Sequence, residues 1–239
     1  MSEILKVIQD RHSSRAPFDQ GHAPSKHDLM QILEAARWAP TAHNMQNFEI
    51  IVVDDKKQLE WLGNIESKIS EDFLRENYQQ LSFSEDELLR KKVGILGTMF
   101  PPSWRTPGDW GKVARKSEPS TLDQTIKGSP MLLIVTYDPR KRAPASENDA
   151  LGFMSLGCIM ENMWLMAQEL GISFQIMSVF GGDSVEHDVK KILEIPEYLR
   201  IAYAVRLWYP VSKPSKFLRV RRDIEGLAHY NRFGNKGFV

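Results

Sequence analysis

The stretch Glu147–Leu170, ENDALGFMSLGCIMENMWLMAQEL, decides the fold, because it predicts one long helix that ends at Gly171, a residue typical of helix C-termini. Apolar side chains occur nearly all round this helix rather than along one stripe. A helix without a polar face is buried on all sides, so we expect it either in the core or in an interface between subunits. Small residues, including Gly152 and Gly157, would let another helix approach closely.

Predicted strands alternate with helices around this segment. Apolar runs predict strands at Met131–Tyr137, Ile172–Met177 and Ile201–Tyr209, with a helix at Ser184–Leu193 that is closed by Pro196. Such alternation indicates an α/β (α+β) architecture, in which helices flank a sheet.

The N-terminal part predicts two further helices and a strand. Apolar residues at helical spacing predict a short helix over Ser2–Asp10. Ser25 is a predicted N-cap with Asp28 three residues on, and Pro40 cannot continue the helix that follows. After a polar loop, Phe48–Asp54 reads as a strand.

A long segment of different character interrupts this pattern. We expect one domain over residues 1–239, in which residues 55–127 form a variable, partly helical and partly irregular insertion. Its irregular part, Met99–Glu118, contains two tryptophans, which argue against disorder. Long irregular segments are often lids, so Trp104 and Trp110 are interpreted either as packing of the insertion or as a lid over a site.

Composition excludes several classes of protein. Lys plus Arg and Asp plus Glu both number 31, so the formal net charge is zero and no global field favours nucleic acid or an anionic membrane. Cys158 is the only cysteine, which excludes an intrachain disulfide and a cysteine-based zinc site. The histidines show no metal-ligand spacing, and neither a membrane span nor a secretory apolar region is evident. We therefore expect a cytoplasmic protein with no metal, membrane or nucleic-acid partner.

Basic and amide side chains occur in three separate polar segments. They are Arg11, Ser13 and Arg15 after the first helix, then Thr41, His43, Asn44 and Gln46 in the loop after Pro40, then Arg219, Arg221 and Arg222 in the tail. Guanidinium groups grip a phosphate in fork geometry and a hydroxyl adds a further bond, so the set suits a phosphate-bearing ligand. A solvated charged surface is the alternative, and His12 and His43 are interpreted either as solvated loop residues or as proton donors.

Several motifs occur in a fixed order along the chain. They are RHSSR (11–15), APTAHNMQNFEIIVV (39–53), Leu156-Gly157 with Asn162, Leu165, Ala167 and Leu170-Gly171-Ile172, then Gly181-Gly182, LEIPE (193–197) and the tail RVRRDIEGLAHYNRFG (219–234). Together they resemble the FMN-dependent nitroreductase family over residues 1–54 and 128–234. Some positions differ from the family pattern: Thr41 replaces serine, Asn47-Phe48 replaces Pro-Trp, and Val179 replaces proline.

The resemblance implies a nitroreductase-like sandwich, in which helices flank a central, mostly antiparallel sheet, and an intertwined homodimer with FMN at the interface. The residues it implies for the cofactor are Arg11, His12, Ser13 and Arg15 at the phosphate, ribityl chain and pyrimidine edge; Arg219 and Arg221 near the phosphate; Pro40, Thr41, Ala42 and Asn44 at the flavin of the partner subunit; and Gly181 and Gly182 beside the ring. Reduced FMN is negative at N1 and O2, so a nearby cation, for which Arg15 is the candidate, would stabilise it.

The activity implied is an FMN-dependent oxidoreductase that takes hydride from NADH or NADPH and reduces a nitro compound or a quinone. The flavin N5 carries the chemistry, so no catalytic side chain is expected. Phe100, Trp104 and Trp110 would supply aromatic walls for the acceptor if the irregular segment folds over the site. The alternatives are a reductive dehalogenase or a flavin-fragmenting enzyme that uses Arg105, Lys112 or Arg115, a flavin-binding protein without turnover, and a basic-tail scaffold without cofactor.

Overall fold

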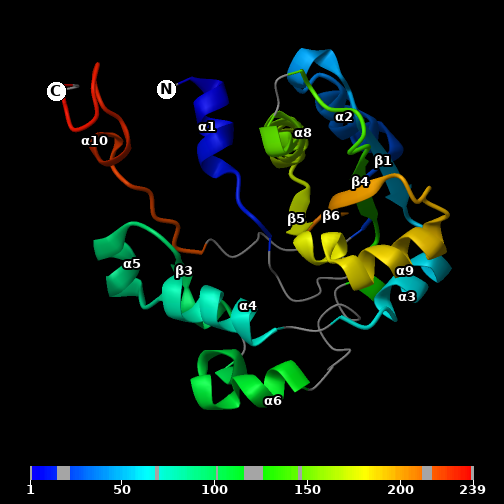
Figure 1. Ribbon diagram of the computed structural model, residues 1–239, viewed down its shortest axis with the longest axis horizontal. Helices are drawn as coiled ribbons and strands as arrows, with labels where there is room; N and C mark the ends of the chain where they lie inside the picture. Colours follow the sequence, from blue (N-terminus) through cyan, green and yellow to red (C-terminus); the bar gives the residue numbers. More distant parts are fainter. Residues whose placement is uncertain are drawn as a thin grey trace. The chain divides into compact units, whose positions relative to one another are not determined.

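The computed structural model forms two compact units (Figure 1). Unit 1 is Met1–Ser67 with Pro119–Pro214, and unit 2 is Lys68–Glu118 with Ser215–Val239. The structure describes residues 2–14, 22–67, 70–100, 102–115, 126–144, 147–211 and 217–237.

Unit 1 contains a four-stranded antiparallel sheet with strand order β1-β4-β6-β5. The strands are β1 (Phe48–Val53), β4 (Leu132–Tyr137), β5 (Ser173–Met177) and β6 (Arg200–Trp208). Ile50 pairs with Val135 across β1 and β4, and Met177 pairs with Ala204 across β5 and β6. The strand predictions are therefore confirmed to within one or two residues at each end.

Helices cover both faces of this sheet (Figure 1). Helices of unit 1 with described bounds include α1 (Glu3–Asp10), α2 (Lys26–Arg37), α3 (Lys56–Gly63), α8 (Ala150–Glu169) and α9 (Asp183–Leu193), with short turns η1 (Ala42–Asn44), η6 (Glu147–Asp149) and η7 (Ser178–Gly181). Side chains alternate across a strand, so Leu133 and Val135 of β4 pack with α2 and α8, while Leu132 and Ile134 pack with α3 and α9. The expected flanked sheet is confirmed.

The start of α2 is capped as the sequence predicts. The side chain of Ser25 accepts a hydrogen bond from the backbone N–H of Asp28 at 3.1 Å. The Asp28 carboxylate in turn accepts a hydrogen bond from the hydroxyl of Tyr209, just after β6. This bond lowers the pKa of Asp28 from its ordinary value, because it stabilises the ionised carboxylate.

The long helix α8 differs from its prediction at its N-terminus, and only part of its apolar surface is buried within the chain. It begins at Ala150 rather than Glu147, because Asn148 and Asp149 adopt left-handed φ values of 49° and 56°. One row of its side chains is buried in the core, but Phe153 and Met154 are 54% and 65% exposed. Burial within the chain therefore accounts for only part of its apolar surface. Among the described residues α8 is the one helix long and apolar enough to cross a membrane, although such a core helix is weak evidence for a span.

Unit 2 consists of short elements around a small aromatic core. They are α4 (Glu71–Arg75), η2 (Glu76–Gln80), β2 (Ser82–Phe83), α5 (Glu85–Lys91), β3 (Ile95–Leu96), η3 (Gly97–Met99), η4 (Pro102–Arg105), η5 (Pro107–Asp109), α6 (Trp110–Arg115) and α10 (Ile224–Leu227). Strands β2 and β3 pair in parallel, and Leu74, Tyr78 and Trp110 form the core. An ion pair between Lys92 and Asp223 joins the two chain segments of this unit.

Candidate functional site

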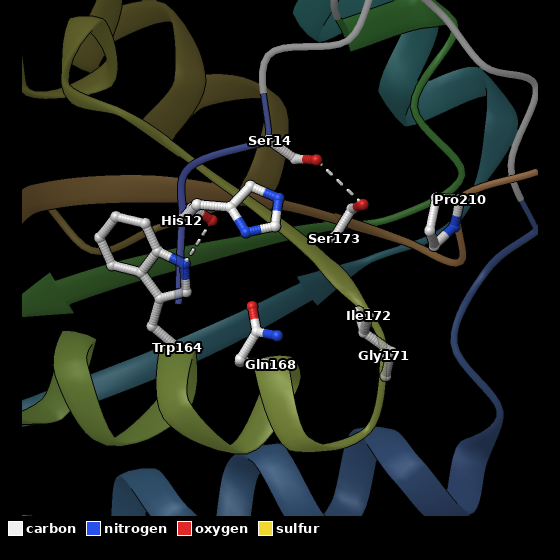
Figure 2. Close-up of a pocket in the computed structure, with 8 residues that line it drawn as sticks. All are labelled: His12, Ser14, Trp164, Gln168, Gly171, Ile172, Ser173 and Pro210. Carbon is white, nitrogen blue, oxygen red and sulfur yellow. Dashed lines mark hydrogen bonds between the residues drawn. The ribbon is translucent and has the colours of Figure 1, made fainter. Parts of the chain in front are cut away.

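A small pocket of mixed polar and apolar lining lies in unit 1, where the chain after α1 passes the end of α8 and the start of β5. Its cavity volume is about 90 Å³, and it is lined by His12, Ser14, Trp164, Gln168, Gly171, Ile172, Ser173 and Pro210. Figure 2 shows the His12 ring among these residues, with Trp164 and Gln168 projecting from α8. The pocket is therefore built from three segments that are far apart in the sequence, at residues 12–14, 164–173 and 210.

Backbone and hydroxyl bonds fix the segment that carries His12. The backbone N–H of Ser14 donates to the carbonyl oxygen of Phe174 at 3.1 Å, which holds the chain beside β5. The Ser14 hydroxyl donates to the Ser173 hydroxyl at 3.1 Å, and both residues are buried. The indole N–H of Trp164 donates to the carbonyl oxygen of His12 at 3.2 Å (Figure 2). The position of His12 is thus set from two directions.

One ring nitrogen of the His12 imidazole has no partner among the residues that the structure describes. Nδ1 lies 3.1 Å from the carbonyl oxygen of Asp10, and since a carbonyl oxygen only accepts, Nδ1 carries the proton. Nε2 is buried and has no hydrogen-bond partner among the residues that the structure describes. A buried polar atom left unpaired costs about 1–3 kcal/mol. This atom is therefore poised to bind a polar group that enters the pocket.

Arg11 lies beside the same pocket, held against α8. Its guanidinium carbon is 4.2 Å from the centre of the Trp164 ring, and its Nε is 3.0 Å from Oε1 of Glu161. The ring of Trp164 itself stacks on the ring of Phe174, with centroids 5.2 Å apart and an interplanar angle of 14°. A cation stacked on a ring that is itself packed has few alternative positions, so Arg11 is preorganised next to His12.

The loop after α2 carries four other predicted site residues. Pro40 is exposed, while Thr41 and Ala42 are half-buried and Asn44 is exposed. His43, Asn44 and Gln46 all have positive φ values, of 51°, 53° and 46°. The hydroxyl of Thr41 accepts a hydrogen bond from the N–H of Gln46 at 3.2 Å. The loop is therefore a compact left-handed turn that is closed by its own bonds.

The two predicted glycines lie in the turn between β5 and α9. A Cβ on Gly181 would come within 3.1 Å of the carbonyl oxygen of Ile201, so glycine allows this turn to pack directly on β6. The N–H of Gly182 donates to the carbonyl oxygen of Val179 at 3.1 Å, so this N–H already has a partner inside the turn.

The remaining predicted residues fall into three groups. Ser13 is half-buried next to His12, and Arg15 lies outside the described residues. Arg219 and Arg221 are exposed in unit 2, where the Arg221 guanidinium donates to the carbonyl oxygen of Val220 at 2.8 Å. The structure thus brings Arg11, His12 and Ser13 to one place in unit 1, and the role of the tail arginines stays a prediction.

The aromatic residues predicted for the substrate pack together in unit 2. Trp110 is buried and donates its indole N–H to the carbonyl oxygen of Trp104 at 2.8 Å. The rings of Phe100 and Trp104 stack with their centroids 6.1 Å apart, and the centroids of Phe100 and Tyr78 are 4.9 Å apart in an edge-to-face contact. Burial raises the pKa of Tyr78 above its ordinary value. These contacts agree with packing of the insertion, and a lid role stays a prediction.

Sequence reasoning missed the residues that α8 contributes to the pocket. Trp164 and Gln168 line the pocket, and Glu161 pairs with Arg11 next to it. The three residues are spaced three and four positions apart, so they share one face of the helix. Two polar residues and a tryptophan at this spacing, within an otherwise apolar helix, are a signal that could have identified them.

Comparison with known proteins agrees with this sheet and its flanking helices. A model of the nitroreductase family matches residues 8–207, and the chain belongs to this family. A search of curated proteins gives no match. The expected resemblance and fold are confirmed.

Three solved structures illustrate the shared fold. A nitroreductase with bound FMN from Bacteroides fragilis is 22% identical with a TM-score of 0.59, covering 97% of this chain and 100% of that one. An FMN-dependent nitroreductase from Clostridium difficile is 17% identical with a TM-score of 0.58, covering 96% and 99%. A nitroreductase family protein from Clostridium novyi is 18% identical with a TM-score of 0.57, covering 98% and 96%.

Proposed function

We propose that the protein is an FMN-dependent oxidoreductase that uses NADH or NADPH to reduce a small aromatic acceptor, a nitro compound or a quinone. Membership of the nitroreductase family, the FMN bound in the Bacteroides fragilis structure and the FMN dependence of the Clostridium difficile nitroreductase support a flavin oxidoreductase. When bound, FMN would accept a hydride from the nicotinamide at its N5 and would then reduce the acceptor. The observation that carries the proposal in this chain is the buried Nε2 of His12, which lacks a partner within the described ranges and lies beside Arg11.

The pocket suits the polar end of FMN better than its ring. Its volume of about 90 Å³ is well below the roughly 300–1,000 Å³ of sites that enclose a whole ligand. Nε2 of His12 accepts from a hydroxyl or, when protonated, donates to a phosphate oxygen, and Gln168 adds an amide. Arg11 does not line the pocket, but it is stacked on the lining residue Trp164 and paired with Glu161, and it supplies a cation next to the pocket. These groups match a phosphate or the ribityl hydroxyls.

The flat ring would then lie outside this pocket, between two copies of the chain. Apolar side chains that a single chain leaves exposed support a dimer: Ile4, Leu5 and Ile8 on α1, and Phe153 and Met154 on α8. In this proposal the loop that contains Thr41 and Asn44 contacts the flavin of the partner subunit, and the turn at Gly181 and Gly182 lies beside the ring.

A visible spectrum and a turnover assay test this function. We expect the purified protein, after loading with FMN, to show flavin absorption bands and to oxidise NADH or NADPH steadily when menadione or a nitrofuran is added. A colourless protein whose melting temperature does not rise with added FMN would contradict the cofactor assignment. Bound FMN without turnover of either nicotinamide would reduce the function to flavin binding.

A further inference from the structure

The loop at residues 41–46 is attached to the long helix by one buried hydroxyl. Ser155 of α8 is 4% exposed, and its Oγ accepts a hydrogen bond from the N–H of Ala42 at 3.0 Å. The same hydroxyl donates its proton to the carbonyl oxygen of Leu151 at 2.7 Å. Since a hydroxyl has one proton, its donation to Leu151 leaves a lone pair directed at Ala42. The helix therefore holds this acceptor in a fixed direction.

The conformation of this loop needs such an attachment. His43, Asn44 and Gln46 carry a Cβ yet adopt left-handed φ values, which are unfavourable for L-residues and are tolerated best by asparagine. Bonds inside the loop, such as Gln46 N–H to Thr41 Oγ1 at 3.2 Å, close the turn but do not place it in the molecule. Its placement must come from contacts with neighbouring elements.

The far end of the loop has a separate anchor. The buried side chain of Asn47 donates to the carbonyl oxygen of Lys141 at 3.2 Å, and the carbonyl oxygen of Asn47 accepts from the N–H of Asp138 at 3.0 Å. The loop is thus held by the turn after β4 at one end and by Ser155 at the other. Loss of the Ser155 bond would free the end that carries Thr41 and Ala42.

We infer that Ser155 is a positioning residue, which holds the loop at residues 41–46 in the place where it contacts the flavin. This inference rests on the proposed function, because the loop residues Thr41, Ala42 and Asn44 are those proposed to reach the cofactor. Ser155 itself lies behind the loop and acts through Ala42. No proton or electron passes through it.

Two measurements on a Ser155→Ala variant test the inference. Removal of the hydroxyl leaves the Ala42 N–H without this acceptor, so we expect its hydrogen exchange in the ligand-free protein to accelerate at least about tenfold, while core amides of β4 keep their protection. We expect the dissociation constant for FMN to rise about three- to tenfold, the factor that loss of one neutral hydrogen bond gives. Ser155→Thr keeps the hydroxyl and is expected to restore both values.

Ser129→Ala is the matched control. Ser129 is also a buried serine of unit 1, and its hydroxyl donates to the carbonyl oxygen of Met131 at 3.0 Å, but it does not contact the loop. We expect this variant to change neither Ala42 exchange nor FMN affinity. Equal effects in Ser129→Ala and Ser155→Ala would mean general loosening and would overturn the inference.

The outcomes also separate this inference from the proposed function. Wild-type protein that binds FMN, together with a Ser155→Ala variant unchanged in either measurement, would overturn the positioning role alone. Wild-type protein that binds no FMN would overturn the proposed function itself.

Discussion

Unit 1 contains two clusters of charged and polar side chains, and they differ in how completely their groups are paired. Between α9 and β6, the buried carboxylate of Glu186 bonds Arg200 Nε at 2.9 Å, Lys190 Nζ at 3.2 Å and the N–H of Ile201 at 3.0 Å. In the pocket beside α8, Nε2 of His12 is buried and has no partner in the described part of the chain. The first cluster is closed, whereas the second is open to a ligand.

This difference shows that burial of charge does not by itself identify a functional site. Glu186 and Lys190 are 4% and 6% exposed, yet their bonds to each other and to the backbone leave no room for a ligand's groups. The pocket at His12 is less charged, but a polar atom there lacks the bond that burial normally requires. The incomplete pairing is therefore the more informative signal.

The largest predicted effect comes from breaking the closed cluster. In Glu186→Ala, Lys190 keeps its charge inside the protein but loses its carboxylate, so we expect a loss of about 3–5 kcal/mol in the free energy of unfolding. Urea denaturation measures this loss. Asp183→Ala is the control, because its carboxylate, 3.2 Å from Arg200, is 97% exposed and such pairs contribute at most about 1 kcal/mol. Equal losses in the two variants would contradict the assignment of a closed, structural cluster.

A His12→Phe variant tests the cluster at His12. It is expected to weaken FMN binding while leaving the stability of the ligand-free protein nearly unchanged. The ring loses its bond to Asp10 but also loses the unpaired Nε2, so we expect the ligand-free protein to keep its stability within about 1 kcal/mol. Its affinity for FMN should fall, because the pocket no longer offers a nitrogen. Thermal melts and FMN titrations measure the two effects.

His187→Phe, at an exposed position on α9, is the control and should change neither quantity. A His12→Phe protein that unfolds readily but binds FMN with wild-type affinity would show that His12 belongs to a structural cluster as well.

The smallest predicted effect concerns pH and a third charged group, Asp138. Its hydrogen bond from Arg140 at 2.8 Å lowers the pKa of this carboxyl from 3.8 to about 2. A carboxyl whose pKa is lowered in the folded state stabilises the protein at pH values above its unfolded-state pKa. This contribution is lost as the pH falls from about 4 to about 2. Acid titration of wild-type and Asp138→Asn proteins measures it. The variant should show a shallower fall in stability over this window, and identical curves would contradict the prediction.

Local rules predicted the scaffold of unit 1 well. The strand at residues 131–137 and the N-cap at Ser25 depend on nearest neighbours and on side-chain alternation, which the sequence shows directly. The exposed face at Phe153 and Met154 could not be predicted, because composition alone does not distinguish a core helix from an interface helix.

The site was predictable only in part. Of the predicted residues Arg11, His12 and Ser13, only His12 lines the pocket, and its partner Trp164 lies about 150 residues away and is brought there by the packing of α8. Nothing local predicts left-handed φ values at His43 and Gln46, which have a Cβ and depend on anchors elsewhere in the fold.

The most direct test of the central claim is the ratio of affinities for FMN and riboflavin, which differ by the phosphate. If Arg11 and His12 form a phosphate-binding pocket, the wild-type protein should bind FMN at least about tenfold more tightly than riboflavin, since charge-assisted bonds contribute about 1.5–3 kcal/mol. Arg11→Ala should lose most of this preference while its affinity for riboflavin changes little. An unchanged ratio in Arg11→Ala would contradict the account.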